Sequence, residues 1–219
     1  MRDKFNGQVA RRIILDQSFR AKVGHIGSAL SIADIITVLY DKVLHINNPR
    51  DKDRDRFVLS KGHAALALYA ALYLKGWINK KQLNSFCANG TLLGVHPEIG
   101  LAGVDFSTGS LGHGLAMGAG AALAARLDKS KRRVFVLLSD AEFNEGSVWE
   151  TVMFAAHHKL SNLVAIVDLN GQQAFGYTKD VIKLTGLDTR LKNFGWETHR
   201  VDGHDSKKLQ QVFKSLNTT

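Results

Sequence analysis

Two apolar runs in the middle of the chain are predicted to be buried strands. Residues 134–139 read Val-Phe-Val-Leu-Leu-Ser and residues 163–168 read Leu-Val-Ala-Ile-Val-Asp, and each run is followed by polar residues and glycine. A helix is predicted between them, over about 147–159. A strand–helix–strand crossover of this length joins parallel strands. The pattern therefore predicts a parallel sheet.

The rest of the chain is predicted to be mostly helical. Periodic apolar positions or cap residues indicate helices at 4–22, 31–44, 64–75, 79–86, 111–126, 187–193 and 205–216. Two further strands are expected at 57–60 and 196–201, and glycine-rich loops at 24–28, 87–112 and 171–178. Neither repeats nor low-complexity linkers divide the sequence. We expect a single α/β domain over residues 1–219, a parallel sheet with helices on both faces.

The composition narrows the possible partners. The net charge of +9 favours anionic ligands, but the basic residues are scattered and no basic strip interleaved with aromatic residues is visible. We therefore expect an anionic small-molecule substrate and no nucleic acid. No apolar run is long enough for a membrane span, no signal peptide is visible, and Cys87 is the one cysteine. These features predict a soluble cytoplasmic protein without disulfides.

Three loops follow predicted strands, at 60–63, 139–146 and 168–176. Ligands in open parallel sheets bind at the carboxyl ends of the strands. Asp140, Asn170 and a backbone carbonyl beyond it would supply hard oxygen ligands, which suit Mg²⁺ or Ca²⁺ when phosphate oxygens complete the shell. The alternative is structural: Asp140 caps the following helix and Asn170 forms an Asn-Gly turn. The spacing leaves both interpretations open.

Histidines are numerous, at 9 in the chain. Four of them stand beside glycine or proline in loop-like segments, which favours a shared pocket: His25, His63, His96 and His113. A lone loop histidine is more often a surface residue, so only their number argues for a site.

Several short sequence motifs resemble those of transketolases. The thiamine-diphosphate motif has its counterpart in Ser139-Asp140-Ala141, followed about 30 residues later by Asn170-Gly171. Other matching motifs elsewhere in the chain are Gly-His at 24–25, Arg-Phe-Val-Leu-Ser-Lys-Gly-His at 56–63, Gly-Val-His-Pro-Glu at 94–98, Ser-Thr-Gly-Ser-Leu-Gly at 107–112 and Asn-Glu-Gly at 144–146. The chain resembles the N-terminal, thiamine-diphosphate-binding domain of transketolase, and most of all the N-terminal subunit of split transketolases.

The resemblance implies a role for each matching residue. Asp140, Asn170 and the carbonyl of Gln172 would bind Mg²⁺ (or Ca²⁺), which bridges the cofactor's diphosphate. The other implied contacts are His63 and the backbone at Ala141 with the diphosphate, Gly109 and Leu111 with the cofactor's rings, His25 and His96 with the sugar, and Glu145 with a neighbouring subunit. His25, His63 and His96 would also assist proton transfer near neutral pH.

The implied activity is transfer of a two-carbon glycolyl unit from a ketose (phosphate) to an aldose (phosphate). A partner subunit with the family's middle and C-terminal domains would complete the site, in a homo- or hetero-oligomer. The alternative is a truncated or degenerate, non-catalytic transketolase-like fragment that acts as a binding or assembly module.

The match departs from the family's pattern at the metal-binding motif and at the end of the chain. Ser139 and Ala141 stand where the motif has glycine, and the Cβ of Ala141 lies where backbone approaches phosphate. The chain is also expected to be short at its C-terminus, because relatives continue through another strand.

Overall fold

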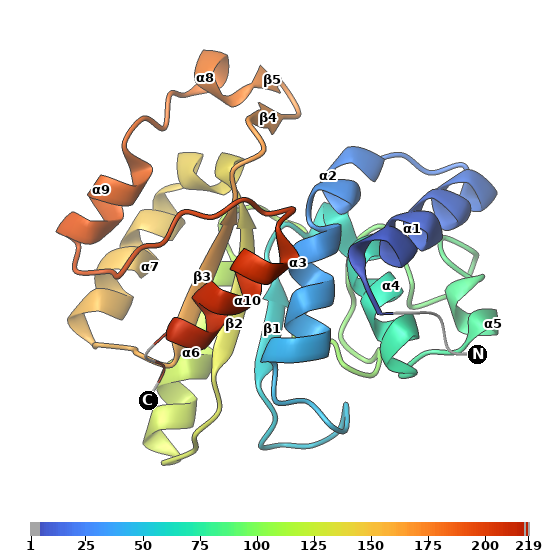
Figure 1. Cartoon of the computed structure of the whole chain (residues 1–219), viewed down its shortest axis with the longest axis horizontal. Coiled ribbons are helices and arrows are strands. Elements are labelled where there is room, and N and C mark those ends of the chain that lie inside the picture. Colours follow the sequence, from blue (N-terminus) through green and yellow to red (C-terminus); the bar gives the residue numbers. More distant parts are fainter. Residues whose placement is uncertain (1–4, 217, 219) are drawn as a thin grey trace. The chain divides into compact units, whose positions relative to one another are not determined.

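The computed structural model describes residues 5–216 and residue 218, and they form two compact units (Figure 1). One unit contains the chain up to Asp55, Gly62–Gly109 and Val201–Leu216; we call it the helical unit. The other contains Arg56–Lys61 and Ser110–Arg200; we call it the sheet unit. Each is described separately below, and the single domain over 1–219 stays a prediction.

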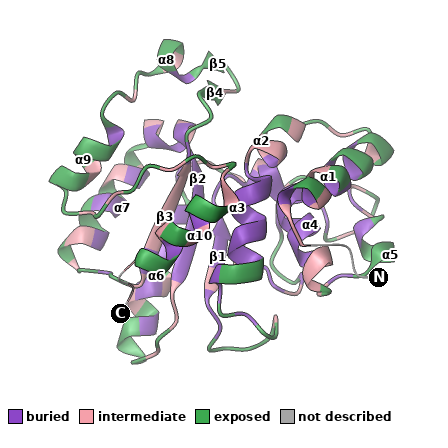
Figure 2. Ribbon diagram, viewed as in Figure 1, coloured by how far each residue is buried: buried purple, intermediate pink, exposed green. Residues whose placement is uncertain are grey.

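The sheet unit is built on three parallel strands, as predicted. They are β1 (Arg56–Leu59), β2 (Val134–Ser139) and β3 (Leu163–Asp168), in the order β1-β2-β3. Every residue of β2 is buried, which explains its continuous apolar run (Figure 2). Ser139 is paired with Asp168 at the carboxyl end of the sheet. The loops that follow β2 and β3 therefore begin at the same edge.

The three longer helices of this unit were predicted, and the two short ones at Asp140–Asn144 and Thr178–Val181 were not. The helices are α6 (Gly114–Leu127), the 3-10 helix η3 (Asp140–Asn144), α7 (Gly146–His157), α8 (Thr178–Val181) and α9 (Leu187–Asn193). Gly118 lets α6 approach the sheet closely, because a Cβ there would lie 2.3 Å from Cγ2 of Val136. The loop predicted at 171–178 contains a short hairpin of β4 (Gln172–Gln173) and β5 (Gly176–Tyr177).

The prediction of a strand at 196–201 is wrong, because the structure has no strand at these described residues. Trp196 is half-buried and its indole N–H donates to the carbonyl of Val152 in α7, at 3.0 Å. Glu197 is exposed and Thr198 is half-buried. An extended segment resting on a helix thus produces the alternating pattern of a strand without a ladder of hydrogen bonds.

The helical unit contains α1 (Gly7–Ala21), α2 (Ile26–Ser31), α3 (Ala33–Val38), the π-helix η1 (Leu39–Val43), the 3-10 helix η2 (Gly62–Ala64), α4 (Ala65–Lys75), α5 (Lys80–Leu83) and α10 (Ser206–Ser215). The caps explain several boundaries. Asn6, Asn79 and Asp205 each accept backbone N–H bonds at the start of a helix. The predicted helix start at Lys4 lies outside the described residues.

The glycine-rich interruption predicted at 24–28 is shorter than expected. Lys22 ends α1 with a φ of 55°, and His25 precedes α2 with a φ of 60°. Two residues in the left-handed region turn the chain sharply, and helix resumes at Ile26. His25 therefore stands at a bend between two helices.

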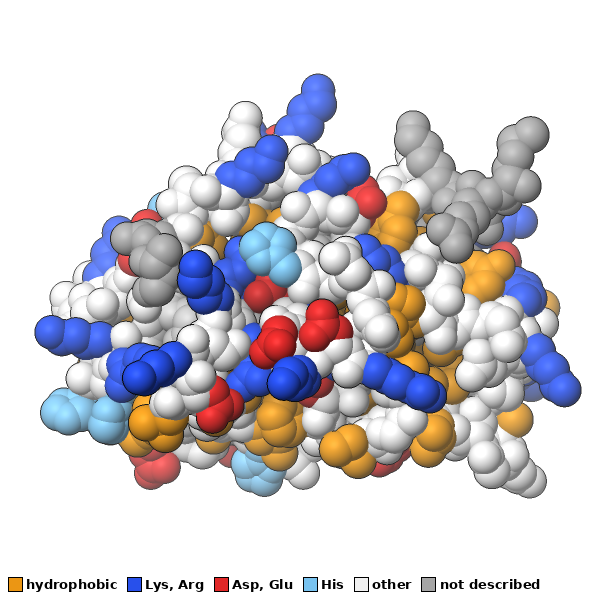
Figure 3. All heavy atoms as spheres, turned by 90° about the horizontal axis from the view of Figure 1, so that it is seen from below, with side chains coloured by type: hydrophobic (Ala, Val, Ile, Leu, Met, Phe, Trp, Pro, Cys, Tyr) orange, Lys and Arg blue, Asp and Glu red, His pale blue; other side chains and the backbone are white. Residues whose placement is uncertain are grey.

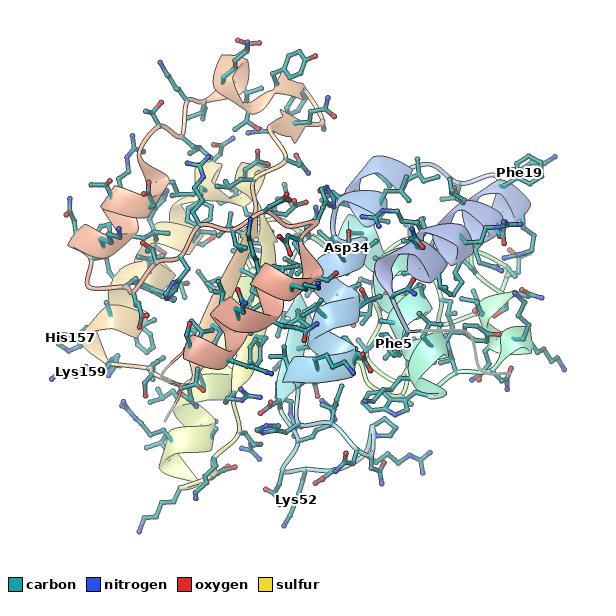
Figure 4. The ribbon with its side chains drawn as sticks, in the orientation of Figure 1. Phe5, Phe19, Asp34, Lys52, His157 and Lys159 are labelled. Atoms are coloured by element: carbon teal, nitrogen blue, oxygen red, sulfur yellow. The ribbon has the colours of Figure 1, made fainter. Side chains whose placement is uncertain are left out.

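One ionic cluster joins three segments of the helical unit. Arg11 of α1 binds Asp34 of α3, which also lies 3.1 Å from Nδ1 of His204, just before α10 (Figure 4). His204 therefore helps to tie α10 to α1 and α3. Among the described residues, no helix is long and apolar enough to cross a membrane.

Candidate cofactor site

Asp140 lies at the end of β2, where the buried strand meets the polar loop. Its side chain is 2% exposed and accepts three hydrogen bonds. Oδ1 accepts from the N–H of Ala141 at 2.9 Å, while Oδ2 accepts from the N–H of Gly171 at 3.1 Å and from the hydroxyl of Thr178 at 2.6 Å. The cap residue of α7 is Glu145, so Asp140 does not cap that helix. Asp140 instead ties the loop after β2 to the loop after β3.

Asn170 stands in that second loop and is exposed. Its Oδ1 accepts from the N–H of Gln172 at 2.9 Å, which makes a turn with Gly171 at a φ of 76°. Its Nδ2 donates to Oδ2 of Asp168 at 3.1 Å. The predicted Asn-Gly turn is thus present, and it leaves the second lone pair of the amide oxygen for a ligand.

Glu142 belongs to the predicted site loop at 139–146, where no specific role was predicted for it, and it joins three loops of the sheet unit. It is fully buried. Oε1 accepts from the hydroxyl of Ser60 and from the N–H of Gly112 (3.2 Å), and Oε2 accepts from the N–H of Ser139 (2.9 Å). Burial raises the pKa of Glu142, and these hydrogen bonds oppose the rise. The Ser-x-x-Glu pattern of a capping box was the available signal.

The glycine-rich loop after residue 109 packs beside Glu145. Gly112 has a φ of 84°, and a Cβ there would lie 2.7 Å from Cβ of Glu145 and from Oγ of Ser147. Leu111 is half-buried, and Glu145 is exposed. Leu111 and Glu145 therefore belong to neighbouring loops of the sheet unit, and Glu145 is exposed to solvent.

The predicted histidines divide between the units. In the helical unit, the rings of His25 and His63 have centroids 5.8 Å apart. They share a small pocket, lined by Val23, Gly24, His25, Ile26, Ala29, His63, Leu66, Phe86 and Val95. His113 belongs to the sheet unit, where it is exposed at the start of α6.

His96 packs against the Gly109 backbone in the helical unit. A Cβ at position 109 would lie 3.2 Å from the imidazole ring, and the hydroxyl of Tyr69 donates to the carbonyl of His96 at 2.9 Å. The loop at 108–109 also meets Gly62, where a Cβ would lie 2.7 Å from the carbonyl oxygen of Thr108. Because Gly62 has no side chain, it can lie against the backbone of residues 108–109. Because Gly109 has no side chain, it can lie against the ring of His96.

Comparison with known proteins identifies the family. The model of the transketolase thiamine diphosphate binding domain matches residues 3–218. This chain belongs to the transketolase family. The match confirms the resemblance, and it covers the thiamine diphosphate-binding domain.

Relatives of this transketolase-family chain include subunits of split enzymes. It is 38% identical over 211 residues to a subunit of the apulose-4-phosphate transketolase of Phocaeicola vulgatus, covering 95% of this chain and 75% of the relative. It is also 38% identical over 204 residues to a 6-deoxy-6-sulfo-D-fructose transketolase subunit of Clostridium sp., covering 92% and 74%. The subunit names imply that those relatives have partner subunits.

The fold of the chain matches transketolases of known structure. It superposes on Campylobacter jejuni transketolase with a TM-score of 0.91 at 30% identity. The superposition covers 97% of this chain but 35% of the C. jejuni chain, so this chain spans about a third of that protein. The predicted parallel α/β fold is confirmed.

The site loops of this transketolase-family chain can supply the ligands that a metal diphosphate needs. Among the described residues, no group of three or more histidine, cysteine, aspartate or glutamate side chains could hold a metal ion. Asp140 retains one carboxylate lone pair beyond its three hydrogen bonds, and Asn170 retains one amide lone pair. Hard oxygen donors of this kind, completed by phosphate oxygens, fit Mg²⁺ or Ca²⁺. The residues present therefore fit the family's cofactor.

On one face of the molecule (Figure 3), positive and negative side chains are mixed, which agrees with the scattered basic residues of the sequence. On the face drawn in Figure 3, lysine and arginine side chains are interspersed with aspartate and glutamate side chains. A strongly basic face of the kind that binds nucleic acid is not seen in this view.

Cys87 is expected to react slowly with alkylating reagents. It is half-buried, and burial raises the pKa of its thiol despite the nearby positive charge of Arg20. Because the thiolate is the reactive form, the pH profile of the iodoacetamide reaction should be shifted to higher pH in the native chain than in the chain unfolded in urea. A native profile at or below the unfolded one would contradict this interpretation.

Proposed function

We propose that this chain is the N-terminal subunit of a split transketolase. With a partner subunit, it transfers a two-carbon glycolyl unit from a ketose phosphate to an aldose phosphate. The observation that carries the proposal is the meeting of Asp140 and the Asn170-Gly171 turn at the carboxyl edge of the sheet, joined by the hydrogen bond from Gly171 to Asp140. Relatives named as subunits of sugar transketolases support the same function.

In this proposal the sheet unit holds the metal and the diphosphate. Asp140, the amide oxygen of Asn170 and the carbonyl of Gln172 would bind Mg²⁺ (or Ca²⁺), and the backbone at Ala141, whose N–H donates to Asp140, would lie beside the diphosphate. When bound, thiamine diphosphate supplies the nucleophilic carbon that allows the sugar's carbon–carbon bond to break and re-form. Leu111 lies along the cofactor's rings. Gln172 is an exposed residue at the start of β4.

The helical unit contributes the sugar-binding and proton-transferring groups. His63 would approach the diphosphate, Gly109 would lie along the rings, and His25 and His96 would bind the sugar's hydroxyls. Imidazole groups exchange protons near neutral pH, which suits the proton transfers of carbonyl chemistry. The shared pocket of His25 and His63 supports this assignment.

The partner in this proposal is a chain with the middle and C-terminal domains of transketolase. Glu145 is exposed beside the glycine-rich loop, where it can contact that partner or a second copy of this chain. The excess of positive charge suits sugar phosphates as substrates. A reducing compartment such as the cytoplasm suits a chain whose one cysteine has no disulfide partner.

The activity is tested by mixing this chain with the candidate partner, Mg²⁺ and thiamine diphosphate. Ketose phosphate donors and aldose phosphate acceptors are supplied in pairs, and the products are resolved by mass spectrometry. We expect a product longer than the acceptor by two carbons, and none when either subunit is omitted. Binding of the cofactor without transfer for any pair would instead favour a binding or assembly module.

Replacing His63 with alanine is expected to lower turnover of the assembled enzyme by about a hundredfold or more, the usual effect of removing a proton-transferring group. The side chain is half-buried, so the free energy of unfolding should change by less than about 1 kcal/mol. His157→Ala is the matched control, because His157 is exposed at the end of α7 (Figure 4). Equal turnover in His63→Ala and His157→Ala would remove His63 from the site.

A further inference from the structure

We infer that the buried pair of Lys61 and Asp168 is a positioning device that keeps the amide oxygen of Asn170 turned outward as a metal ligand. The inference rests on the proposed function, because it concerns the metal that Asn170 would bind. Asp168 belongs to the predicted site loop at 168–176 and Lys61 to the loop at 60–63, but the sequence predicted no specific role for either side chain.

Lys61 follows β1 and its side chain is 0% exposed. Its Nζ lies 2.5 Å from Oδ2 of Asp168, the last residue of β3, whose side chain is 8% exposed. The same Oδ2 accepts the bond from Nδ2 of Asn170 at 3.1 Å. A chain of contacts thus runs from a buried ammonium group to the exposed amide.

The chemistry of the two groups that contact Asn170 determines how its amide is turned. The carboxylate of Asp168 can only accept hydrogen bonds, so it selects the NH₂ end of the amide. The backbone N–H of Gln172 can only donate, so it selects the oxygen end. A flipped amide would place oxygen against carboxylate and NH₂ against N–H, losing both bonds. The oxygen is therefore held beside Gln172, with one lone pair left for a cation.

The ammonium group of Lys61 holds the carboxylate of Asp168 in place. A lysine is rarely buried, and a buried ion pair is often no more stabilising than apolar side chains of the same size. Stability alone is therefore a weak reason for this pair. Groups that orient metal ligands usually affect metal affinity by about ten- to a hundredfold, which gives the pair a measurable role.

The experiment measures metal affinity and does not depend on turnover. Mg²⁺ is titrated, at saturating thiamine diphosphate, into the full chain mixed with its partner subunit, and binding is followed by calorimetry. Asp168→Asn keeps the size of the side chain but replaces the charged acceptor of Asn170 by a neutral amide, a weaker acceptor that can also turn its NH₂ toward Asn170. We expect the half-saturating Mg²⁺ concentration to rise about tenfold or more. Asp188→Asn, an exposed change of the same charge, should leave it unaltered.

A second variant exchanges the two side chains. Asp168→Asn with Asn170→Asp keeps the net charge, and a carboxylate at 170 presents oxygen whichever way it turns. We expect its half-saturating Mg²⁺ concentration to return to within about threefold of the wild type, well inside the effect of losing an orienting group. An exchange variant that binds no better than Asp168→Asn would overturn the inference.

A third variant covers the case in which Asp168→Asn does not fold because Lys61 loses its counter-charge. Lys61→Met with Asp168→Asn removes both charges, and we expect a similar melting temperature with the same loss of Mg²⁺ affinity. Wild-type Mg²⁺ affinity in either folded variant overturns the positioning role. No cofactor binding by the wild-type complex at any Mg²⁺ concentration overturns the proposed function instead, so the two failures are distinguishable.

Discussion

Replacing Asp140 with alanine is expected to abolish metal-dependent binding of thiamine diphosphate by the assembled complex. Asp140 is the one carboxylate in the proposed ligand set, and among the described residues no group of three or more histidine, cysteine, aspartate or glutamate side chains could by itself hold a metal ion. Removing a residue that only orients a metal ligand usually lowers metal affinity by about ten- to a hundredfold, so removing a charged ligand should lower it further. Calorimetry with thiamine diphosphate and Mg²⁺ measures the effect.

The structural role of Asp140 requires a matched control. The carboxylate also anchors Gly171 and Thr178, so the alanine variant loses those bonds as well as the ligand. Thr178→Val removes one of the anchoring bonds and leaves the carboxylate. We expect Thr178→Val to bind the cofactor with affinity within about tenfold of the wild type, the lower end of such indirect effects. Unchanged affinity in Asp140→Ala would refute the metal assignment.

Replacing Glu142 with alanine is expected to lower the free energy of unfolding substantially. Glu142→Ala leaves three buried donors without this acceptor: the hydroxyl of Ser60 and the N–H groups of Gly112 and Ser139. Each unsatisfied buried group costs about 1–3 kcal/mol, and we expect a total loss of about 3–5 kcal/mol in the free energy of unfolding. Urea unfolding followed by circular dichroism measures the loss.

Glu150→Ala is the matched control for this prediction. Glu150 is exposed on α7, so its replacement should change the free energy of unfolding by about 0.5 kcal/mol or less. A loss below about 1 kcal/mol in Glu142→Ala would show that water or other side chains replace the carboxylate. In that case Glu142 would not be the residue that joins the three loops.

The central strands could be predicted because β2 is buried along its whole length and β3 is buried or half-buried throughout. Residues 134–139 and 163–168 contain almost only apolar side chains, and the structure places β2 and β3 at those residues. Helix boundaries at Asn79 and Asp205 could be predicted from the cap residues themselves. In these cases the physical cause of the element lies within the segment.

The errors occurred where structure depends on distant residues. The segment at 196–201 alternates like a strand, but pairing needs a neighbouring strand and the indole of Trp196 instead bonds to α7. Residues Ile26–Ser31 follow a glycine-rich turn and still form a helix, and the hairpin at 172–177 is too short for a pattern. Local sequence does not report which partner an extended or glycine-rich segment will meet.

The candidate site was predicted in part. The rule that ligands gather at the carboxyl ends of parallel strands placed the loops after β2 and β3 together, and the Ser139–Asp168 register confirms that placement. The roles of the individual site residues stay predictions. Lys61 could not have been found, because a lysine in a turn after a strand resembles a surface residue. In the structure it is buried and paired with Asp168, more than 100 residues away in the sequence.

Binding of thiamine diphosphate tests the central claim most directly. The cofactor is titrated calorimetrically into this chain with Mg²⁺, with and without a partner subunit that carries the middle and C-terminal transketolase domains. The proposed function predicts saturable binding by the mixture that is lost when EDTA removes the metal. No binding by the mixture at any Mg²⁺ concentration would contradict it.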